Sequence, residues 1–507
     1  MRNLIRVFFL VSLSTSAWAS GPSFIIQRNS GLPVTIFNLT FRVGSADDPQ
    51  GSAGLAALTA DLLREGGVKE LKTPSGKTLP ARTRAEIEDF LYPLASNIHM
   101  SVEREQVSIT ATTSMTDADA VFDLITQILL APAFDAQEFE RVKSEFLDAV
   151  QKRAPREDQE SLGKAALEQR MYGREHPYGH IVDGSVDGLK SITREKVIQF
   201  HRDLFTKNRL TVGAAGMITP GLEKKLRTVF ANLPEGKTSQ ANVPDVARKS
   251  GVRLLLVKGP FTATGVHLGQ PISINRGSAE FPEMYLAALT FGKHRSFVGR
   301  LMKVVREIRG LNYGTYSYIE EFPHGGELLA EPTQVSRTRQ AFTLWGRPTT
   351  LENGCFLLRQ VYREVSNVTS IGLTEKEFKS GKNFLVGSIP LMAMSFARRL
   401  GYAIDAQFYG IDGDYIQMLQ SKVKNADLKR VNALLKKYID PKTLDIVVVT
   451  PDPQKFKSEI LGSSCSIHYA PGVNKPQEIL DEDQVISRFK IPLKESDIEI
   501  VESESLF

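Results

Sequence analysis

The chain has 507 residues, of which 42% are hydrophobic and 24% are charged. This composition is typical of globular proteins and excludes fibrous and disordered classes. The formal net charge of +5 is small for the length, and no dense run of Lys and Arg with interleaved aromatic residues occurs, so we expect no nucleic-acid binding. No apolar stretch is long enough to predict a transmembrane segment.

The first 19 residues have the layout of a secretory signal peptide. Arg2 and Arg6 precede an apolar run over residues 7–13, and the segment ends in Ala-Trp-Ala at residue 19. This pattern predicts removal of residues 1–19 and export of the rest of the chain. The periplasm is the favoured destination, with full secretion as the alternative.

The first half of the remaining chain, residues 20–231, mixes strands and helices. Alternating apolar and polar residues predict strands, and periodic apolar residues bounded by acidic residues or proline predict helices. The expected strands are 23–27, 34–43, a pair within 99–113, and 210–216. The expected helices are 54–65, 84–95, 117–130, 136–152 and one that begins at 220.

Residues 232–250 are rich in proline, glycine and polar residues and lack hydrophobic periodicity, which predicts a linker. The second half, residues 251–470, repeats the layout of the first. Its expected strands are 252–258, 265–271, 313–319, 340–345 and 444–450. Its expected helices are 284–292, 297–309, 353–365, 375–385 and 389–408.

A short repeat indicates that the two halves are homologous. Leu-Ala-Ala-Leu-Thr at 55–59 recurs 231 residues later at 286–290, and the closing strands at Leu210 and Leu444 begin 234 residues apart. Because markers at opposite ends of each half agree within three residues, an ancient duplication is the better interpretation. The expected fold class is α+β with two homologous halves.

The cysteines and the C-terminal segment leave alternatives open. Cys355 and Cys465 could form a bridge in an oxidising compartment, but we expect two free, buried thiols. Residues 471–507 form an acidic tail, for which we expect a solvated segment. Ile498 and Ile500 alternate with acidic residues there, so an edge strand is the other interpretation of the tail.

The eight histidines predict no metal site. His176 and His180 lie four residues apart, but Pro177 separates them and no Glu is placed between them as in a zinc motif. A capping or packing role is therefore favoured. The other six are isolated and expected to be structural: His99, His201, His267, His294, His324 and His468. The sequence also has no phosphate-binding loop and no nucleophile elbow.

Three groups of residues carry a family resemblance. They are Gly-Ser-Ala-Asp-Asp-Pro at 44–49 with Gly-Leu-Ala at 54–56 and Glu-Gly-Gly at 65–67, His-Pro-Tyr-Gly at 176–179, and Arg-Glu-Ile-Arg-Gly-Leu-Asn-Tyr at 306–313. Together they resemble the pitrilysin and insulinase family of zinc peptidases, the inverzincins, over nearly all of the chain after residue 19. The resemblance implies a clamshell of two halves around a peptide. Each half would hold two α/β repeats, with a mostly antiparallel sheet and helices on one face.

The zinc motif of that family does not survive in this sequence. The family carries H-x-x-E-H on a helix, in which two histidines hold zinc and the Glu acts as general base. Ala57 and Asp61 replace the histidines here, and Ala60 replaces the base. The third ligand and its supporting Glu align with Ala149 and Val142. A methyl group donates no lone pair and one carboxylate holds zinc poorly, so we expect no metal, no cofactor and no peptidase activity from this chain alone.

The second-half signature is retained. In active relatives an Arg and a Tyr seven residues apart contact the substrate at the scissile bond and stabilise the oxyanion. They match Arg306 and Tyr313. Some bacterial relatives divide the zinc motif and the Arg–Tyr pair between two chains. The resemblance therefore implies a pseudoenzyme that binds peptide substrate and completes the active site of a partner chain, which would carry an intact H-x-x-E-H and the zinc in a heterodimer.

Two other hypotheses remain open at this point. The chain could be a clamshell that holds a peptide or a partner without any proteolytic role. It could also be an autonomous enzyme with unrelated chemistry, although no motif points to one.

Overall fold

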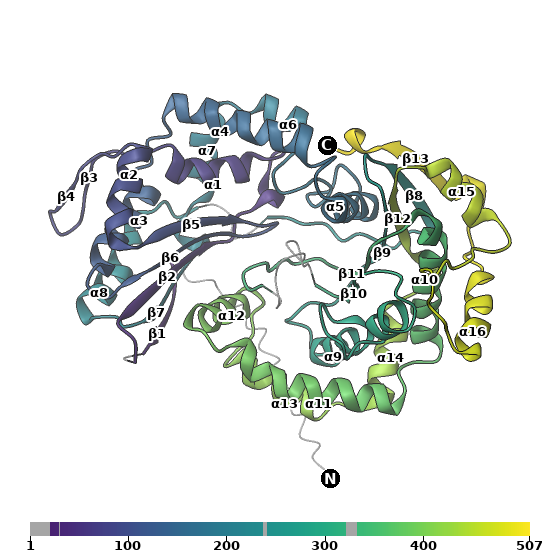
Figure 1. The fold of residues 1–507 in the computed structure, drawn as a ribbon. Helices are drawn as coiled ribbons and strands as arrows, with labels where there is room; N and C mark the ends of the chain where they lie inside the picture. Colours follow the sequence, from purple (N-terminus) through teal and green to yellow (C-terminus); the bar gives the residue numbers. More distant parts are fainter. Residues whose placement is uncertain (1–20, 30, 237–240, 321–331) are drawn as a thin grey trace, which may run out of the picture.

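The computed structural model describes residues 21–29, 31–236, 241–320 and 332–507. The expected signal peptide therefore lies outside the described residues, as does His324. Within the described part of the chain, two sheet-and-helix units lie side by side and together form an arc (Figure 1).

The first unit is built on a five-stranded sheet in the order β1-β7-β2-β6-β5. The strands pair antiparallel except for β1 and β7. In β2, Phe37, Leu39 and Phe41 alternate with Asn38 and Thr40, so the apolar side chains share one face of the sheet and enter the core. The strands are β1 Ser23–Arg28, β2 Val34–Phe41, β5 Asn97–Val102, β6 Val107–Ser114 and β7 Leu210–Gly216, with a separate hairpin of β3 Leu71–Lys72 and β4 Thr78–Leu79.

Helices cover the apolar face of this first sheet, where α1 and α3 contact β5 and β6. Side chains from α1, α3, α7 and α8 form one core with the strands. The helices of this part of the chain are α1 Leu55–Glu65, α2 Arg84–Leu91, α3 Ala118–Leu130, α4 Ala136–Asp148, α5 Gln159–Tyr172, α6 Val186–Ser191, α7 Arg194–Leu204 and α8 Pro220–Val229.

The second unit repeats the first and adds one strand. Its six-stranded sheet has the order β13-β8-β12-β9-β11-β10, which matches the first sheet strand for strand if β13 is set aside. This agreement supports the duplication inferred from the Leu-Ala-Ala-Leu-Thr repeat. The strands are β8 Arg253–Lys258, β9 Thr264–Ile272, β10 Thr315–Tyr318, β11 Gln340–Thr349, β12 Asp445–Thr450 and β13 Ile498–Glu502.

The helices of the second unit differ from prediction in number and in detail. Four helices, at 415–424, 428–438, 453–461 and 477–487, were not predicted. The helix expected over 389–408 is two helices, because α11 ends at Met392 and the Ser395 side chain caps a new helix by accepting a hydrogen bond from Arg398 N–H. The helix expected over 297–309 contains a π-helical segment, Met302–Glu307. The helices are α9 Phe281–Gly292, α10 Gly354–Ser370, α11 Glu375–Met392, α12 Phe396–Phe408, α13 Tyr415–Lys424, α14 Leu428–Tyr438, α15 Pro453–Leu461 and α16 Gln477–Ser487.

Each unit places one helix on the other unit's sheet. Helix α5 precedes β7 in the chain but packs on β9 and β12 of the second sheet, whereas α12 packs on β7 and β2 of the first. Leu400 and Ile404 of α12 are buried against Ala215 of β7. The expected fold of two homologous halves is confirmed, but the second face of each sheet also carries this exchanged helix, which the sequence analysis did not predict.

The expectation of two free cysteines is wrong. Cys355 in α10 and Cys465, which follows α15, form a disulfide across 110 residues. The two residues are far apart in sequence but lie side by side because α10 and α15 pack together.

The C-terminal segment forms an edge strand, as one of the two interpretations predicted, and is not simply a solvated tail. β13 pairs in parallel with β8, with Ile498 opposite Leu254, and α16 packs on α10. Residues 232–236 and 241–250, the described part of the expected linker, contain no strand and only the end of a 3₁₀ turn.

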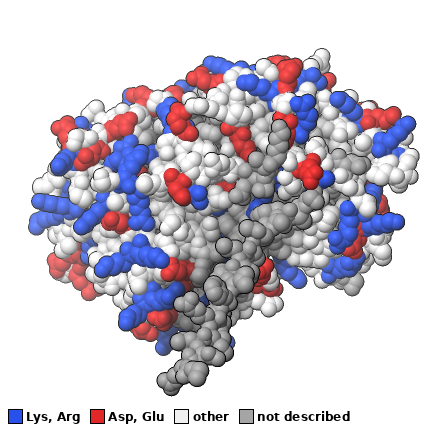
Figure 2. Space-filling view, turned by 180° about the vertical axis from the view of Figure 1, so that it is seen from behind, with Lys and Arg blue, Asp and Glu red and all other residues white. Residues whose placement is uncertain are grey.

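Among its described residues, the back of the molecule has no large patch of purely basic or purely acidic side chains (Figure 2). Basic and acidic side chains are interspersed over the back of the molecule (Figure 2). No helix among the described residues is both long enough and apolar enough to cross a membrane.

Candidate functional site

Helix α1 carries the positions at which the zinc motif would stand. It begins after Gly54, whose φ of 101° favours glycine. The Asp48 carboxylate caps the helix by accepting hydrogen bonds from the N–H groups of Gly54 and Ala56, each at 2.7 Å. Ala57 and Ala60 are both buried. Because alanine is the strongest helix former, the helix persists with packing residues in place of metal ligands.

Asp61 is the only potential ligand left at the three motif positions, and it has no partners placed to complete a metal site within the described part of the chain. Burial, followed by the charges of Asp183, Glu65 and Glu145, raises the pKa of Asp61 to about 6. In the described ranges, no group of three or more His, Cys, Asp and Glu side chains is placed to hold a metal ion. The residues present therefore do not fit the zinc that the sequence resemblance would place on this helix.

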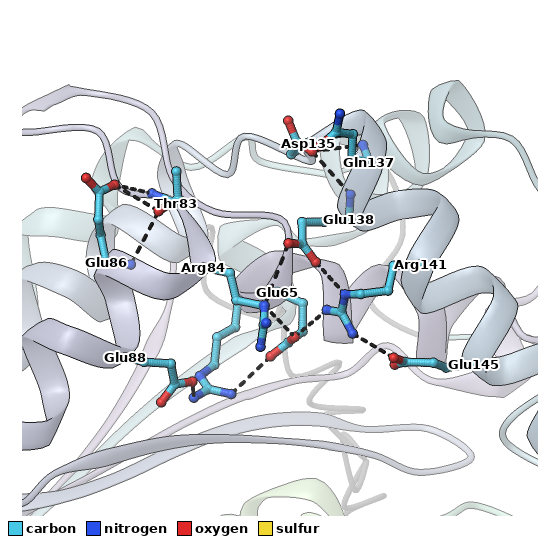
Figure 3. Close-up of polar contacts among 11 residues, drawn as sticks. Glu65, Thr83, Arg84, Glu86, Glu88, Asp135, Gln137, Glu138, Arg141 and Glu145 are labelled. Carbon is cyan, nitrogen blue, oxygen red and sulfur yellow. Dashed lines mark hydrogen bonds and ion pairs between the residues drawn. The ribbon is translucent and has the colours of Figure 1, made fainter.

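Arginine side chains pair with a cluster of carboxylates made up of Glu65 at the end of α1 and Glu138 and Glu145 on α4. Figure 3 shows Arg141 of α4 between the three, at 2.6 Å from Glu65, 2.6 Å from Glu138 and 2.8 Å from Glu145. Arg84 of α2 lies 3.8 Å from Glu65 and 3.7 Å from Glu138. This network ties α1, α2 and α4 together, so it has a structural role.

The aligned positions of the third ligand also lack donor atoms. Val142 is buried in α4, and Ala149 begins the π-helical segment Ala149–Arg153 directly after that helix. Ala149 lines a cavity between the two units. No lone pair from either residue could reach a metal bound on α1.

Arg306 and Tyr313, which the family resemblance singles out, lie together in the structure. The guanidinium carbon of Arg306 lies 4.4 Å from the centroid of the Tyr313 ring, which is a cation–π contact. Arg347 of β11 approaches the same ring at 5.6 Å. Tyr313 is 63% exposed, so the pair lies at the surface and can meet another molecule.

The surroundings of this pair depend on both units. Arg347 donates to Glu160 of α5 at 2.6 Å, so the arginine beside Tyr313 is held by an ion pair with the exchanged helix. A shift of α5 relative to the second sheet would therefore change the position of Arg347. Arg306, Tyr313 and Arg347 form what we call the Arg–Tyr cluster.

A cavity of about 440 Å³ lies beside α5, between the two units. Its walls come from the β5–β6 turn and α5 on one side and from β9, β10 and β11 on the other. Trp345, Tyr318, Leu162 and Leu167 give it a largely apolar and aromatic lining. Its volume is in the range of small-molecule and side-chain pockets.

A buried charge cluster closes one wall of the cavity. Glu168 of α5 pairs with Arg104 of the β5–β6 turn and, at 2.7 Å, with Arg337 near the start of β11. Burial alone would raise the pKa of the Glu168 carboxyl, but the charges of Arg104 and Arg337 hold it at about 2. The carboxylate therefore stays ionised and links both units.

Two family models match the chain. "Insulinase (Peptidase family M16)" matches residues 24–177, and "Peptidase M16 inactive domain" matches residues 191–385. Together they cover more than half of the sequence, and the second match begins within the first unit, before α7, and continues into the second. The chain belongs to the M16 peptidase family. With alanines at two of the three key positions of α1, it is an inactive member of the M16 family.

Relatives of the chain include other inactive M16 proteins. A Helicobacter pylori protein named "Non-peptidase homolog YmxG" is 23% identical over 427 residues, 84% of this chain and 91% of the relative. The solved structure of a peptidase M16 inactive domain from Pseudomonas fluorescens has a TM-score of 0.73 at 22% identity and covers 86% of this chain and 97% of that chain. The periplasmic protease PqqL from Escherichia coli has a TM-score of 0.65 at 10% identity and covers 93% of this chain and 49% of that chain.

The histidines of the M16 loop at 176–180 pack within the protein. His176 Nδ1 accepts a hydrogen bond from Tyr178 N–H at 3.0 Å, and its Nε2 lies 3.2 Å from Pro244 O. His180 Nδ1 lies 2.8 Å from Ile181 O. The packing role favoured for these two residues is confirmed.

Sequence reasoning missed the residues that line the cavity. Trp345 and His267 were passed over, the second as an isolated structural histidine. The signal was weak, since each sits in an apolar strand and their proximity depends on the pairing of β9 with β11, in which the two are direct partners.

Proposed function

We propose that this chain is the non-catalytic, substrate-binding subunit of a two-chain zinc metallopeptidase, in which Arg306 and Tyr313 assist peptide hydrolysis at the partner's metal. The observation that carries the proposal is the exposed Arg306–Tyr313 stack on a chain whose own α1 lacks zinc ligands. Because Tyr313 is exposed, the pair is accessible to a molecule outside the chain.

The geometry of the Arg–Tyr cluster suits oxyanion stabilisation. The stack at 4.4 Å fixes the phenol ring and the guanidinium relative to each other before substrate arrives, and preorganised donors are the effective ones in catalysis. The Tyr313 hydroxyl can donate a hydrogen bond to a developing oxyanion, and Arg306 supplies positive charge beside it. Arg347 adds a second cation on the same ring.

The partner in this proposal is an M16 chain with an intact H-x-x-E-H, and the heterodimer holds zinc only in that chain. Export follows from the signal-peptide pattern of residues 1–19, and the periplasm is the proposed location. The partner's zinc would activate water and polarise the scissile carbonyl. This chain's own residues would bind and orient the peptide.

The test is reconstitution with the partner. The tagged chain is recovered from cells under native conditions, and mass spectrometry of the eluate identifies any chain with H-x-x-E-H. Partner-dependent cleavage of a peptide library is then measured for Tyr313→Phe and Arg306→Ala, with exposed Tyr92→Phe and Arg202→Ala as controls.

We expect kcat/KM to fall roughly 100-fold in each of the two cluster variants, with unchanged thermal stability and unchanged co-purification. The control variants should retain full activity. Full cleavage activity in both Tyr313→Phe and Arg306→Ala would remove the assigned roles.

The second candidate function is a clamshell that binds a peptide or partner without hydrolysis. The cavity between the units favours it, because a binding pocket needs no metal. In that case no chain with H-x-x-E-H accompanies the protein, and the cluster variants change binding alone.

A further inference from the structure

Exposed apolar side chains gather at the C-terminal end of α11. Phe384 is 39% exposed, Leu391 is 60% exposed, and Met394, two residues after the helix, is 69% exposed. Phe384 and Leu391 are seven residues apart and therefore share one side of the helix, where Gly387 between them adds no side chain. We call Phe384, Leu391 and Met394 the α11 apolar patch. Single exposed apolar residues are normal, but a group of them indicates an interaction surface.

The fold does not require apolar side chains at this place. The helix of the first unit that is equivalent to α11 is α4, because α4 packs on α1 as α11 packs on α9, and α1 and α9 carry the Leu-Ala-Ala-Leu-Thr repeat. The exposed residues in the second half of α4 are Ser144 and Glu145, which are both polar. The α11 apolar patch is therefore a property of this sequence and not of the shared architecture.

Positive charge surrounds the patch. Residues 378–404 contain no Asp or Glu, and helix α13, which packs along α11, contains none either. Glu377, near the start of α11, is paired with Arg300. The basic residues of these three helices after that point are Lys379 and Lys382 in α11, Arg398 and Arg399 in α12, and Lys422 and Lys424 in α13.

Two of these basic residues shape the turn between α11 and α12. Arg398 Nε donates to Met392 O at 2.6 Å, and Arg399 Nε donates to Ala393 O at 3.0 Å. Both bonds satisfy carbonyl groups at the C-terminal end of α11, where a cation is also favoured by the helix dipole. The turn that carries Met394 is therefore held in place with positive charge beside it.

This combination matches the surface of an anionic lipid bilayer. Helices that lie on a bilayer place apolar side chains at the boundary of the acyl chains and Lys or Arg among the headgroups, and each base near an anionic leaflet strengthens binding. Three partly exposed side chains offer much less than the ~800 Å² per partner of a stable protein interface. Helix α11 also lies along the lower edge of the molecule, outside both sheets (Figure 1).

We propose that the α11 apolar patch and the basic residues around it dock this protein on an anionic lipid bilayer, with Leu391 and Met394 inserted at the level of the headgroups. The docking is peripheral and reversible. It belongs to this chain alone and needs neither zinc nor a catalytic partner.

The test is sedimentation of residues 20–507 with lipid vesicles. Residues 1–19, the proposed signal peptide, are left out because their apolar run would itself bind lipid. Vesicles of phosphatidylcholine alone are compared with vesicles of phosphatidylcholine and phosphatidylglycerol in equal parts. We expect at least about tenfold stronger partitioning into the anionic vesicles, and a decrease as added salt screens the charges. No binding to the anionic vesicles, or equal binding to both kinds, overturns the proposal.

Variants locate the lipid contact. Leu391→Ser combined with Met394→Ser should weaken partitioning about tenfold or more, whereas Val485→Ser, an exposed position on the acidic helix α16, should not change it. Lys379→Gln on α11 should weaken it about fivefold, and Lys224→Gln on α8 should leave it unchanged. Thermal melting checks that each variant is folded. A Leu391/Met394 variant that binds like the parent chain would show that lipid contacts another surface and would overturn the proposal.

A protein partner for the same patch is the other outcome of the test. If the Leu391/Met394 variant keeps full vesicle binding but no longer recovers a chain with H-x-x-E-H from cells, the patch is a subunit interface and the lipid proposal is wrong. Vesicle binding uses the isolated chain and involves no cleavage. Failure of the lipid site and failure of the two-chain peptidase are therefore separate results.

Discussion

Replacing Asp61 by asparagine should stabilise the protein at neutral pH. The pKa of Asp61 is about 6 in the folded chain because of burial and the neighbouring carboxylates, against about 3.9 in an unfolded chain. The folded state therefore holds this proton more tightly than the unfolded state. The contribution of Asp61 to the free energy of unfolding is fully present below about pH 4 and is lost as the pH rises through 6.

The size of the effect follows from the shift. About two pKa units correspond to about 3 kcal/mol at pH values above 6. Asp61 is only half-buried, and solvent screening reduces this figure to about 2 kcal/mol. Asparagine keeps the shape of the side chain and carries no charge, so Asp61→Asn should recover most of that amount at pH 7.5 and almost none at pH 4.

Urea unfolding at the two pH values measures the difference. The free energy of unfolding of Asp61→Asn is compared with that of the parent chain, and exposed Asp89→Asn on α2 serves as the matched control. The control should change stability by less than about 0.5 kcal/mol at either pH. A loss of stability in Asp61→Asn at pH 7.5, or an equal gain at both pH values, would refute the reasoning.

Three further changes test the packing of the fold by the same unfolding assay. Replacing Cys355 and Cys465 by alanine should lower the free energy of unfolding by about 2–5 kcal/mol. Reduction of the disulfide in the parent chain should lower it by a similar amount. Arg337→Met should lower the free energy of unfolding by about 3–5 kcal/mol, because the buried Glu168 carboxylate then loses one of its two arginine partners and keeps only Arg104. Ala60→Glu, which restores the family's general base alone, should destabilise the protein by several kcal/mol at pH 7.5 and less at pH 4, since Ala60 is fully buried. A neutral result for the cysteine variant would contradict a stabilising disulfide, and a neutral result for either of the other two would contradict the burial of that site.

The sequence predicts the repeated layout because local patterns produce it. Strands such as β2 alternate apolar and polar residues, and the Leu-Ala-Ala-Leu-Thr repeat marks equivalent helices in the two units. The loss of the zinc motif is also visible in the sequence, since it needs only residue identity at Ala57, Ala60 and Asp61. The sequence matched Arg306 and Tyr313 to the family signature but did not predict that they stack.

Features that depend on tertiary contacts are not visible in the sequence. Helix α5 was not predicted because its buried face includes Gln159, Gly163 and Ala166, which give no strong apolar stripe. The Cys355–Cys465 disulfide depends on the packing of α10 against α15, 110 residues apart.

The cavity residues illustrate the same limit. His267 and Trp345 meet only through the register of β9 and β11. A period-two pattern shows which face of a strand is buried, but it does not show which residue of a distant strand lies opposite.

The exchange of α5 and α12 has a consequence for the origin of the protein. Each sheet is covered on one face by a helix from the other unit, so a single unit would expose an apolar surface that only a second copy could cover. An ancestor with one unit would therefore have been an obligate, helix-swapped dimer, and gene fusion made that pairing permanent. If so, two fragments divided within residues 232–250 should be insoluble alone and should reassemble when they are co-expressed.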